Sequence, residues 1–415
     1  RLQKLHPKEI DLSLNRIKKL VKKLGNPQDD LNCIQVCGTN GKFSTISFMR
    51  AILNEANYKC NIYTSPHVKK INERFIFNDK EIEDNELANL LEEVEKINNG
   101  DPITYFEFLT AAFFYGCKKY KQNLTICEFG LFARYDAVNI LKKNLANIIT
   151  SCGLDHLDWL PKDQRNIKKI VFEKTASLLN SNIIIAKQSS KKITEYIKQN
   201  LIANNANKFF FNEHFSYSLN ENGFFYYEDK HGGLKLPLPN LEGEYQLSNI
   251  STAIATIRNI EEINISDQNI KNGIKKIKSI ARFSEITNGK LKDLVKKNKI
   301  YIDGSHNPLG ASVLNEHLNT LKCNKHIILG MMLNKNHLEY VGYFKDKISS
   351  LTVVDIPNQP AAISGEDLMK KLKNIKNINY KKSIKEAIES IDLKDNDIII
   401  ITGSLYLAGE VLNLN

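Results

Sequence analysis

The sequence lacks any hydrophobic run that approaches the roughly 20 residues of a membrane-spanning helix. Its first segment, residues 1–20, also lacks the apolar core of a signal peptide, because charged residues recur there at helical spacing. We therefore expect a cytoplasmic protein that has no membrane partner.

The seven cysteines form no Cys-x-x-Cys pair, and their number is odd. Most of them lie in apolar runs of strand type, such as LTICEF at 124–129. We expect free, buried and reduced thiols, and neither a disulfide framework nor a zinc site. Internal repeats and low-complexity tracts are also absent from the sequence.

No basic block stands alone, although the net charge is +11. Lysines are spread along the chain with acidic residues between them, so the charge pattern does not favour nucleic-acid binding. The same positive field attracts a nucleotide or an acidic small molecule. The hydrophobic fraction of 42% is that of a globular protein, and a length of 415 residues favours two domains.

The hydrophobic pattern predicts an α/β protein. Apolar residues at helical spacing predict helices at 8–25, 44–57, 84–98, 106–119, 246–258 and 266–279. Short apolar runs predict buried strands at 33–36, 60–65, 124–130, 146–153 and 182–187. This alternation is typical of a mainly parallel sheet with helices on both faces.

The pattern changes twice in the second half of the chain. Residues 208–238 are aromatic, alternating and rich in turn residues, which predicts a small antiparallel β subregion. After a polar stretch without a strong period, further strands are predicted at 299–303, 326–330, 351–356 and 397–402. We expect a large P-loop-type ATPase domain over 1–284, a linker over 285–298 and a smaller Rossmann-like α/β domain over 299–415.

The segment VCGTNGKFST, residues 36–45, lies between a predicted strand and a predicted helix. Backbone N–H groups of such a loop, together with the helix N-terminus, bind phosphate oxygens. Lys42 would reach the β- and γ-phosphates, and Ser44 and Thr45 are placed to cap the helix, contact phosphate or lie near Mg²⁺. The strict G-x-x-x-x-G-K-[ST] pattern fails, because one residue separates Lys42 from Ser44 and the first glycine is missing. The alternative to a nucleotide site is a plain turn that caps the helix.

The loop resembles the G-T-N-G-K-G-[ST] loop of the Mur-ligase superfamily, in its folate-ligase branch. Other segments resemble that branch in the same order: KLGNPQ (23–28), YTSPH (63–67), INERF (71–75), TYFEFLTAA (104–112), EFGLFARYDAVN (128–139), GLDH (153–156), EK (173–174), DGSHNP (303–308) and TGSLYLAGEV (402–411). These matches run from residue 23 to residue 411, so the resemblance covers almost the whole chain.

The resemblance implies an ATP-dependent amide ligase, a dihydrofolate synthase, a folylpolyglutamate synthase or both. In the implied reaction a substrate carboxylate attacks the γ-phosphate of ATP and gives an acyl phosphate. The α-amine of L-glutamate then attacks the acyl carbon, and ADP and phosphate are released. The implied partners are dihydropteroate or a reduced folate, L-glutamate, ATP and Mg²⁺, and we expect a monomer.

The resemblance assigns Mg²⁺ binding to Ser65, Glu128 and His156. These residues lie at the ends of predicted parallel strands, and the carboxyl ends of such strands meet at one crevice. Taken alone, Glu128 has the alternative role of an ion-pair partner, and His156 that of a hydrogen-bonded core residue.

The catalytic residues that the resemblance implies are Lys42, Lys174 and His306. Lysine is often carbamylated at the superfamily position of Lys174, which makes Lys174 a candidate for this modification. The local sequence leaves two alternatives open, an exposed helical lysine at Lys174 and a turn-stabilising histidine at His306.

The resemblance also implies two sets of ligand contacts. Those for ATP are Thr39, Asn40, Gly41, Lys42, Ser44, Thr45, Asn249, Arg282 and Asp303. Those for the acceptor and glutamate are Thr104, Tyr105, Phe106, Glu107, Tyr135, Asp136 and Ser404. A planar pterin favours aromatic stacking and a carboxylate at its amino-pyrimidine edge. The aromatic helix that begins near residue 104 has the alternative role of plain core.

Three departures from the branch pattern affect these expectations. Phe43 stands where the branch has glycine, so we expect it to crowd the phosphates or shift the loop. Phe132 and Ala133 replace two glycines of G-L-G-G-R-L-D, which stiffens the loop at the acceptor site. The segment NKN at 334–336 replaces D-K-D, so two carboxylates become amides.

Two other functions are alternatives. A cell-wall-type Mur ligase, or another ATP-dependent amino-acid ligase, would need a nucleotide-sugar domain before the phosphate loop, where only about 35 residues stand. A non-catalytic nucleotide-binding homologue would explain Phe43 and the lost glycines. The retained charged residues of the site argue against that second alternative.

Overall fold

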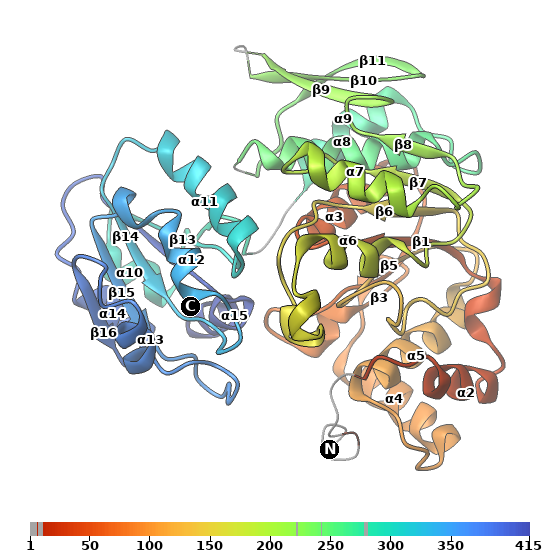
Figure 1. Cartoon of the computed structure of the whole chain (residues 1–415), viewed down its shortest axis with the longest axis horizontal. Helices are drawn as coiled ribbons and strands as arrows, with labels where there is room; N and C mark the ends of the chain where they lie inside the picture. Colours follow the sequence, from red (N-terminus) through yellow and green to blue (C-terminus); the bar gives the residue numbers. More distant parts are fainter. Residues whose placement is uncertain (1–5, 7–10, 221–222, 242, 278–280) are drawn as a thin grey trace. The chain divides into compact units, whose positions relative to one another are not determined.

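The structure, a computed structural model, describes residues 6, 11–220, 223–241, 243–277 and 281–415. The chain divides into two units, coloured along the sequence in Figure 1. The first unit comprises Arg1–Cys152, Leu160–Asn240 and Gln246–Ile277. The second unit comprises Gly153–Trp159, Leu241–Tyr245 and Lys278–Asn415. Among the described residues, no helix combines the length and the apolar character that crossing a membrane requires.

An eight-stranded sheet of order β4-β3-β2-β5-β1-β6-β7-β8 organises the first unit. Its strands are β1 Asn32–Cys37, β2 Cys60–Tyr63, β3 Phe75–Phe77, β4 Lys80–Glu81, β5 Leu124–Glu128, β6 Ala146–Ile149, β7 Asn182–Ile185 and β8 Lys208–Phe210. All neighbours from β2 to β8 pair in parallel, and only β3 and β4 add antiparallel pairs at one edge. The predicted mainly parallel sheet is confirmed.

Six helices of the first unit match the predicted segments, whereas the sequence missed the two helices at 167–175 and 191–200. The helices are α2 Asn15–Lys23, α3 Lys42–Glu55, α4 Asp84–Asn98, α5 Tyr105–Cys117, α6 Ile167–Thr175, α7 Lys191–Asn200, α8 Tyr245–Arg258 and α9 Asp267–Lys276. The helix predicted at 8–25 is confirmed over α2, and the part of that prediction at 8–10 lies outside the described residues. Short 3-10 turns join the elements at Pro27–Asp30, Ile71–Arg74, Lys118–Tyr120, Leu157–Trp159, Lys162–Gln164 and Lys345–Lys347.

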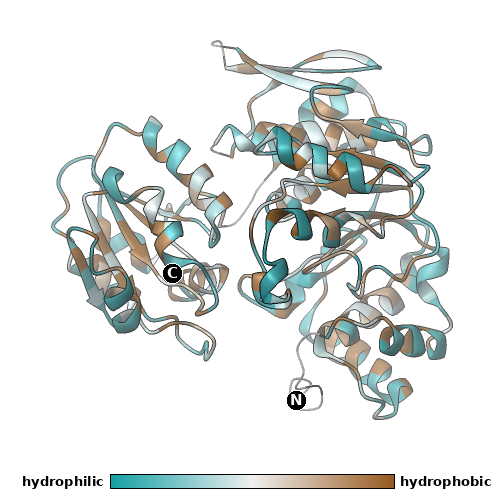
Figure 2. Ribbon diagram, viewed as in Figure 1, coloured by the Kyte–Doolittle hydropathy of each residue, from teal (hydrophilic) through white to brown (hydrophobic). Residues whose placement is uncertain are grey.

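Both faces of the main sheet are buried, which explains why its strands are apolar throughout. Cys33 and Cys37 of β1 join a core to which α2, α4, α5, α6 and α7 contribute. Ile34 and Val36 alternate with them, point to the other face and are fully buried as well. The buried side chains of α3, which packs against β1, lie outside the first core. Figure 2 shows hydrophobic colour along the strands and hydrophilic colour on the outer helices.

The antiparallel subregion is a three-stranded sheet of order β11-β10-β9, packed against α9. Its strands are β9 Phe215–Asn220, β10 Phe224–Asp229 and β11 Gly232–Pro237. The prediction for 208–238 is wrong for β8, which pairs in parallel with β7 and completes the main sheet. A three-residue aromatic strand has too few residues to show which partner it pairs with.

The second unit contains a six-stranded sheet of order β12-β13-β17-β14-β15-β16, parallel except for β12. Its strands are β12 Ser284–Glu285, β13 Lys299–Ile302, β14 Lys325–Leu329, β15 Ser350–Val354, β16 Ile378–Lys381 and β17 Ile398–Thr402. Its helices are α10 Lys290–Val295, α11 Pro308–Thr320, α12 His337–Gly342, α13 Gly365–Lys371, α14 Ile384–Glu389 and α15 Leu405–Leu414. The sequence missed β16, because this edge strand is half exposed and has no continuous apolar run.

The segment 285–298 was expected to be a linker, but it carries regular structure. Strand β12 pairs with β13, and α10 buries Leu291 and Val295. This segment groups with the second unit. Helix α10 has only six residues, too few for a helical period to stand out in the sequence.

The predicted burial of the cysteines is confirmed for all of them except Cys323, which is half-buried. All seven are free thiols, and six of them are buried. Burial raises the pKa of Cys37 to about 12 and that of Cys152 to about 11, so both remain protonated near neutral pH.

Candidate active site

Two glycines shape the loop between β1 and α3. Gly38 has φ 140°, and a Cβ there would lie 1.9 Å from Thr150 Oγ1. Gly41 has φ 90°, and a Cβ there would lie 2.5 Å from Asn249 Oδ1. Both positions therefore require glycine for the backbone angle and for the close approach of a neighbour. This close approach also places Asn249 of α8 beside the loop. The sequence predicts that both the loop and Asn249 contact ATP.

The backbone N–H groups of the loop divide into two sets. Those of Thr39 and Asn40 donate to Ser151 O, at 2.9 and 3.1 Å, which fixes the loop on the chain after β6. The first N–H groups of α3 have no acceptor within the helix. Gly41, the N-cap residue, provides no side chain to cap them. The N-terminus of α3 is thus suited to bind a phosphate group.

Lys42 folds back over the loop. Its Nζ donates to Gly38 O at 3.2 Å and to Thr39 O at 3.3 Å, and lies 3.6 Å from Glu128 Oε1. Phe43 lies in the first turn of α3, and its φ is not positive. The backbone therefore does not require glycine at position 43, and the effect of the Phe43 side chain on the phosphates stays a prediction.

Glu128 and Ser65 meet at the ends of neighbouring strands. Ser65 N donates to Glu128 Oε2 at 3.3 Å, and both residues are buried. Ser65 Oγ and Thr45 Oγ1 are buried without a hydrogen-bond partner in the part of the chain that the structure describes. The carboxylate of Glu128 and the nearby hydroxyl of Ser65 are hard oxygen donors, which fit Mg²⁺.

A metal at Glu128 would need most of its ligands from elsewhere. Among the described residues, no three His, Cys, Asp or Glu side chains gather into a metal-binding group. Water and the phosphate oxygens of ATP commonly complete the octahedral shell of Mg²⁺. The third predicted ligand, His156, belongs to the second unit, so its joint role with Ser65 and Glu128 stays a prediction.

Lys174 of α6 is buried, which excludes the alternative of an exposed helical lysine. Its Nζ donates to Gly38 O at 3.0 Å and to Leu131 O at 2.8 Å. The ring of Phe132 lies 5.6 Å from the same nitrogen. Lys174 thus connects the phosphate loop with the loop at 130–136.

Asp136 shapes the loop at 130–136. Its carboxylate accepts the N–H groups of Gly130, Leu131 and Val138 at 2.9, 3.2 and 3.0 Å. Complete burial raises the pKa of Asp136 to about 6, although these three hydrogen bonds and Lys174 act in the opposite direction. Asp136 therefore organises the loop, and a direct contact with an acceptor stays a prediction.

The two glycine replacements in this loop are accommodated without strain. Phe132 and Ala133 are buried, and neither has a positive φ. Tyr135, by contrast, is 38% exposed, and the guanidinium of Arg134 lies 4.5 Å from its ring centroid. The loop is anchored by its middle residues and presents one aromatic ring to solvent.

The predicted acceptor helix α5 begins with a capping box. Thr104 Oγ1 accepts Glu107 N at 3.2 Å, and Thr104 N donates to Glu107 Oε2 at 2.9 Å. Arg16 Nε donates to the same carboxylate oxygen at 2.9 Å. Tyr105 and Phe106 are half-buried, with the Phe106 ring 6.1 Å from that of Tyr63. Thr104 and Glu107 thus support the fold, and their acceptor role stays a prediction.

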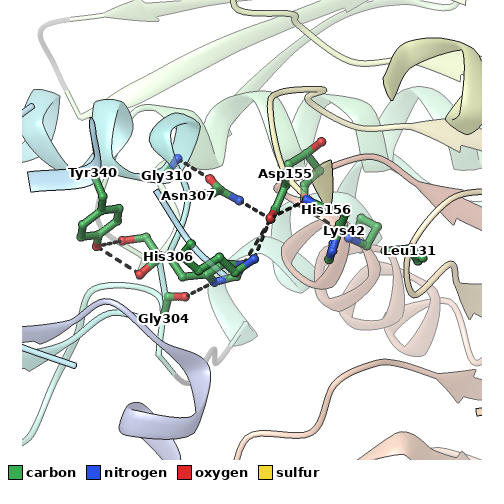
Figure 3. Close-up of polar contacts among 12 residues, drawn as sticks. Lys42, Leu131, Asp155, His156, Gly304, His306, Asn307, Gly310 and Tyr340 are labelled. Atoms are coloured by element: carbon green, nitrogen blue, oxygen red, sulfur yellow. Dashed lines mark hydrogen bonds and ion pairs between the residues drawn. The ribbon is translucent and has the colours of Figure 1, made fainter. Parts of the chain in front are cut away.

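Asp155 is the centre of a buried polar cluster in the second unit. It accepts hydrogen bonds from Lys335 Nζ at 2.6 Å and Asn307 Nδ2 at 2.9 Å. His306 Nε2 lies 3.4 Å from its carboxylate, and His306 Nδ1 lies 2.9 Å from Gly304 O (Figure 3). The imidazole therefore faces an acceptor at each nitrogen. The sequence did not single out Asp155, although the GLDH motif contains it.

Charges around Asp155 keep it ionised. Burial opposes ionisation, but His156, His306 and Lys335 together hold the pKa of Asp155 well below its usual value. His156 has φ 57°, and its N–H donates to Asp155 Oδ1 at 2.9 Å. The short segment that carries His156 is thereby held in the second unit.

The other predicted residues of the second unit also have local partners. The carboxylate of Asp303 accepts two backbone N–H groups, and Arg282 NH1 donates to Ala281 O at 3.0 Å. Ser404 caps α15, and Asn336, one of the two amides that replace carboxylates, caps α12. Contacts of these residues with ATP or glutamate stay predictions.

Known proteins resemble this chain over its full length. The family model described as "Mur ligase, glutamate ligase domain" matches residues 290–405. The dihydrofolate synthase/folylpolyglutamate synthase of Escherichia coli K12 is 26% identical over 420 residues, covering 100% of this chain and 93% of the relative. The folylpolyglutamate synthase of Lacticaseibacillus casei is 27% identical, covering 95% and 92%.

A solved structure agrees with these matches. The Escherichia coli FolC protein in complex with DHPP and ADP superposes with a TM-score of 0.87 at 26% identity, covering 99% of this chain and 95% of that one. The match of this structure therefore extends over both units of the chain. Over its full length the chain is thus similar to proteins of the folate branch of the Mur-ligase superfamily, and its residues 290–405 match the glutamate ligase domain of that superfamily.

Proposed function

We propose that this protein uses ATP to join L-glutamate to the carboxylate of a pteroate or folate, as a dihydrofolate synthase, a folylpolyglutamate synthase or both. The observation that carries the proposal is the phosphate loop, with Lys42 beside Glu128, in a chain whose full-length relatives bear these names. The alternative of a non-catalytic homologue is less favoured, because Phe43, Phe132 and Ala133 stand where the backbone does not need the positive φ of glycine.

The reaction needs positioning and charge neutralisation more than covalent chemistry from the protein. A carboxylate oxygen of the acceptor forms a bond to the γ-phosphorus of ATP, and the bond to the ADP oxygen breaks. The amine of glutamate then attacks the acyl carbon, which expels phosphate together with the acceptor oxygen. Lys42 and the N-terminus of α3 stabilise the negative charge on the transferring group.

Ser65 and Glu128 would hold Mg²⁺, with His156 as a third ligand and Thr45 Oγ1 close to the phosphates. When bound, the metal offsets charge on the triphosphate and orients it. Ser65 Oγ is suited to this role because it is buried without a partner among the described residues. Its desolvation is unfavourable unless a ligand restores a polar contact.

The contacts of Lys174 favour an ammonium over a carbamate. The Nζ donates to two carbonyl oxygens, Gly38 O and Leu131 O. A carbamate nitrogen keeps one N–H, so one carbonyl would lose its donor, and the new carboxylate oxygens would face carbonyl oxygens. We therefore propose that Lys174 binds these two loops as an unmodified lysine.

Carbon-13 NMR tests the state of Lys174 directly. Protein equilibrated with labelled bicarbonate should show no carbamate resonance that disappears in Lys174→Arg. A carbamate signal present in the wild-type protein and absent from the variant would contradict the proposal. Lys169→Arg, which changes a less buried lysine of the same helix, is the control for unspecific labelling.

The acceptor would contact exposed Tyr135 and half-buried Phe106, and the loop that Asp136 organises would surround it. Glutamate would be bound by the second unit. His306, whose imidazole is held between Asp155 and Gly304 O, is the candidate residue for contact with its carboxylate. We further propose that the protein acts as a monomer, and the cytoplasmic location stays a prediction.

The test is phosphate release with ATP, Mg²⁺ and glutamate, with dihydropteroate or a mono-glutamyl tetrahydrofolate offered in parallel. Turnover with dihydropteroate indicates a dihydrofolate synthase, turnover with the reduced folate a polyglutamate synthase, and turnover with both a bifunctional enzyme. Folded protein that binds ATP but releases no phosphate with either acceptor would contradict the proposal.

A further inference from the structure

Glu173 and Lys174, two consecutive residues of α6, hold the loop at 130–136 in two different ways. The side chain of Lys174 donates to Leu131 O and Gly38 O. The carbonyl oxygen of Glu173 accepts the N–H groups of Ala133 and Arg134 at 3.1 and 3.2 Å. One turn of helix therefore fixes this loop and also contacts the phosphate loop.

The side chain of Glu173 adds a bidentate ion pair. Arg134 Nε donates to Glu173 Oε2 at 2.8 Å, and Arg134 NH2 donates to Oε1 at 2.9 Å. The Glu173 side chain is only 5% exposed, whereas that of Arg134 is 35% exposed. Two parallel hydrogen bonds fix the orientation of the guanidinium plane as well as its distance.

The guanidinium of Arg134 in turn supports an exposed ring. It lies 4.5 Å from the ring centroid of Tyr135 and 5.5 Å from that of Phe172. Tyr135 is the exposed aromatic residue of the loop, so its placement follows that of Arg134. The contacts run from the buried carboxylate of Glu173 through Arg134 to the surface of the loop.

We propose that Glu173 is a positioning residue for the acceptor substrate: through Arg134 it fixes the Tyr135 ring that the acceptor contacts. This inference rests on the proposed function for the identity of the acceptor. The link from Lys174 to Gly38 is separate, and so are the contacts of Lys174 and Asp136 with the start of the loop at 130–136. Loss of the Glu173 carboxylate therefore loosens the part of the loop that carries Arg134 and Tyr135 and leaves the phosphate loop in place. Glu173 thus affects acceptor binding and not ATP binding.

The test is Glu173→Gln, which keeps the size of the side chain and removes its charge. We expect KM for the acceptor to rise about tenfold, while the Kd for ATP and the kcat change less than twofold. Glu173→Asp keeps the charge and should recover part of the loss. An unchanged acceptor KM, or an equal loss of ATP affinity, would overturn the proposal.

Lys169→Gln is the matched control. Lys169 Nζ binds the same carboxylate, at 2.9 Å from Glu173 Oε1, and also lies 4.7 Å from the ring centroid of Phe172, which belongs to α6 and not to the loop. The variant therefore removes a charge partner of Glu173 and should keep the acceptor KM of the wild-type protein. A tenfold rise in the acceptor KM of Lys169→Gln would show that the charge around Glu173 matters and not its contact with Arg134. That result would overturn the role given to Arg134.

Amide hydrogen exchange separates this inference from the proposed function, because it needs no substrate. In Glu173→Gln without ligands, peptides covering 130–136 should exchange at least tenfold faster, and peptides covering the phosphate loop should be unchanged. Unchanged exchange at 130–136 would contradict the inference even in an active ligase. Faster exchange there in a protein without ligase activity would support the loop contact and reject only the proposed function.

Discussion

At the residue scale, the site depends on buried polar groups whose partners decide their charge. Asp136 accepts three backbone N–H groups, yet its complete burial dominates and raises its pKa to about 6. Asp155 is also buried, but it has charged neighbours in addition to one backbone donor, and its pKa is held well below the usual value. Two buried aspartates thus respond to pH in opposite directions.

The pH dependence of stability tests the state of Asp136. Its pKa rises from 3.8 to about 6 on folding, so the native state holds the proton more tightly. Its contribution to stability is therefore full below pH 4 and is lost as the pH rises through 6, by roughly 3 kcal/mol at most. The difference in unfolding free energy between the wild-type protein and Asp136→Asn should change in this window. A difference that stays constant from pH 4 to 7 would exclude the raised pKa.

Lys42 is the residue whose loss should affect the reaction most. Its Nζ lies over the loop and close to Glu128, where the γ-phosphate is expected. Lys42→Met should lower kcat by about a hundredfold or more, because a charge used in the transition state is removed. Lys59→Met, at a lysine that is 58% exposed, is the control and should be fully active. Turnover of Lys42→Met within threefold of the wild-type value would remove Lys42 from the mechanism.

At the element scale, the β1–α3 junction shows why the phosphate-loop prediction succeeded despite a failed pattern. The G-K-[ST] spacing is broken by Phe43, but Phe43 enters the helix with an ordinary backbone. The glycines that matter are Gly38 and Gly41, and both are retained. The signal therefore lay in the strand–loop–helix order and in these glycines.

Gly41→Ala tests the loop geometry. Gly41 has φ 90° and Asn249 close by, whereas Gly100 has φ 73° and nothing within 4 Å of an added Cβ. Both alanine variants should lose about 1 kcal/mol of stability from backbone strain. Gly41→Ala alone should also weaken ATP binding, by about tenfold. Equal ATP affinity in the two variants, measured by titration calorimetry, would argue against this loop as the nucleotide site.

Several element predictions failed because the element was too short to show its period. Strand β8 has three residues and α10 has six, so neither the partner of the first nor the existence of the second followed from the pattern. The edge strand β16 is half exposed and lacks the apolar run that marked the buried strands. Helix α4, by contrast, has four turns with a clear apolar face, and its predicted range of 84–98 is confirmed.

At the scale of the whole molecule, fold class and family followed from motifs spread along the chain. The sequence could not give the partners of buried charges, because these pairs join distant residues. Arg16 with Glu107, Arg134 with Glu173, and Asp155 with Lys335 are examples. Each pair became visible only once the fold had brought its members together. The sequence therefore missed residues that position other side chains more often than it missed residues that lie in motifs.

The most direct test of the central claim is the path of oxygen from the acceptor. The acceptor is supplied with both carboxylate oxygens labelled with oxygen-18, together with ATP, Mg²⁺ and glutamate, and the released phosphate is analysed by mass spectrometry. An acyl-phosphate ligase transfers one labelled oxygen to each phosphate, and the amide product keeps the other. Unlabelled phosphate, released by the same protein while ADP forms, would contradict the account.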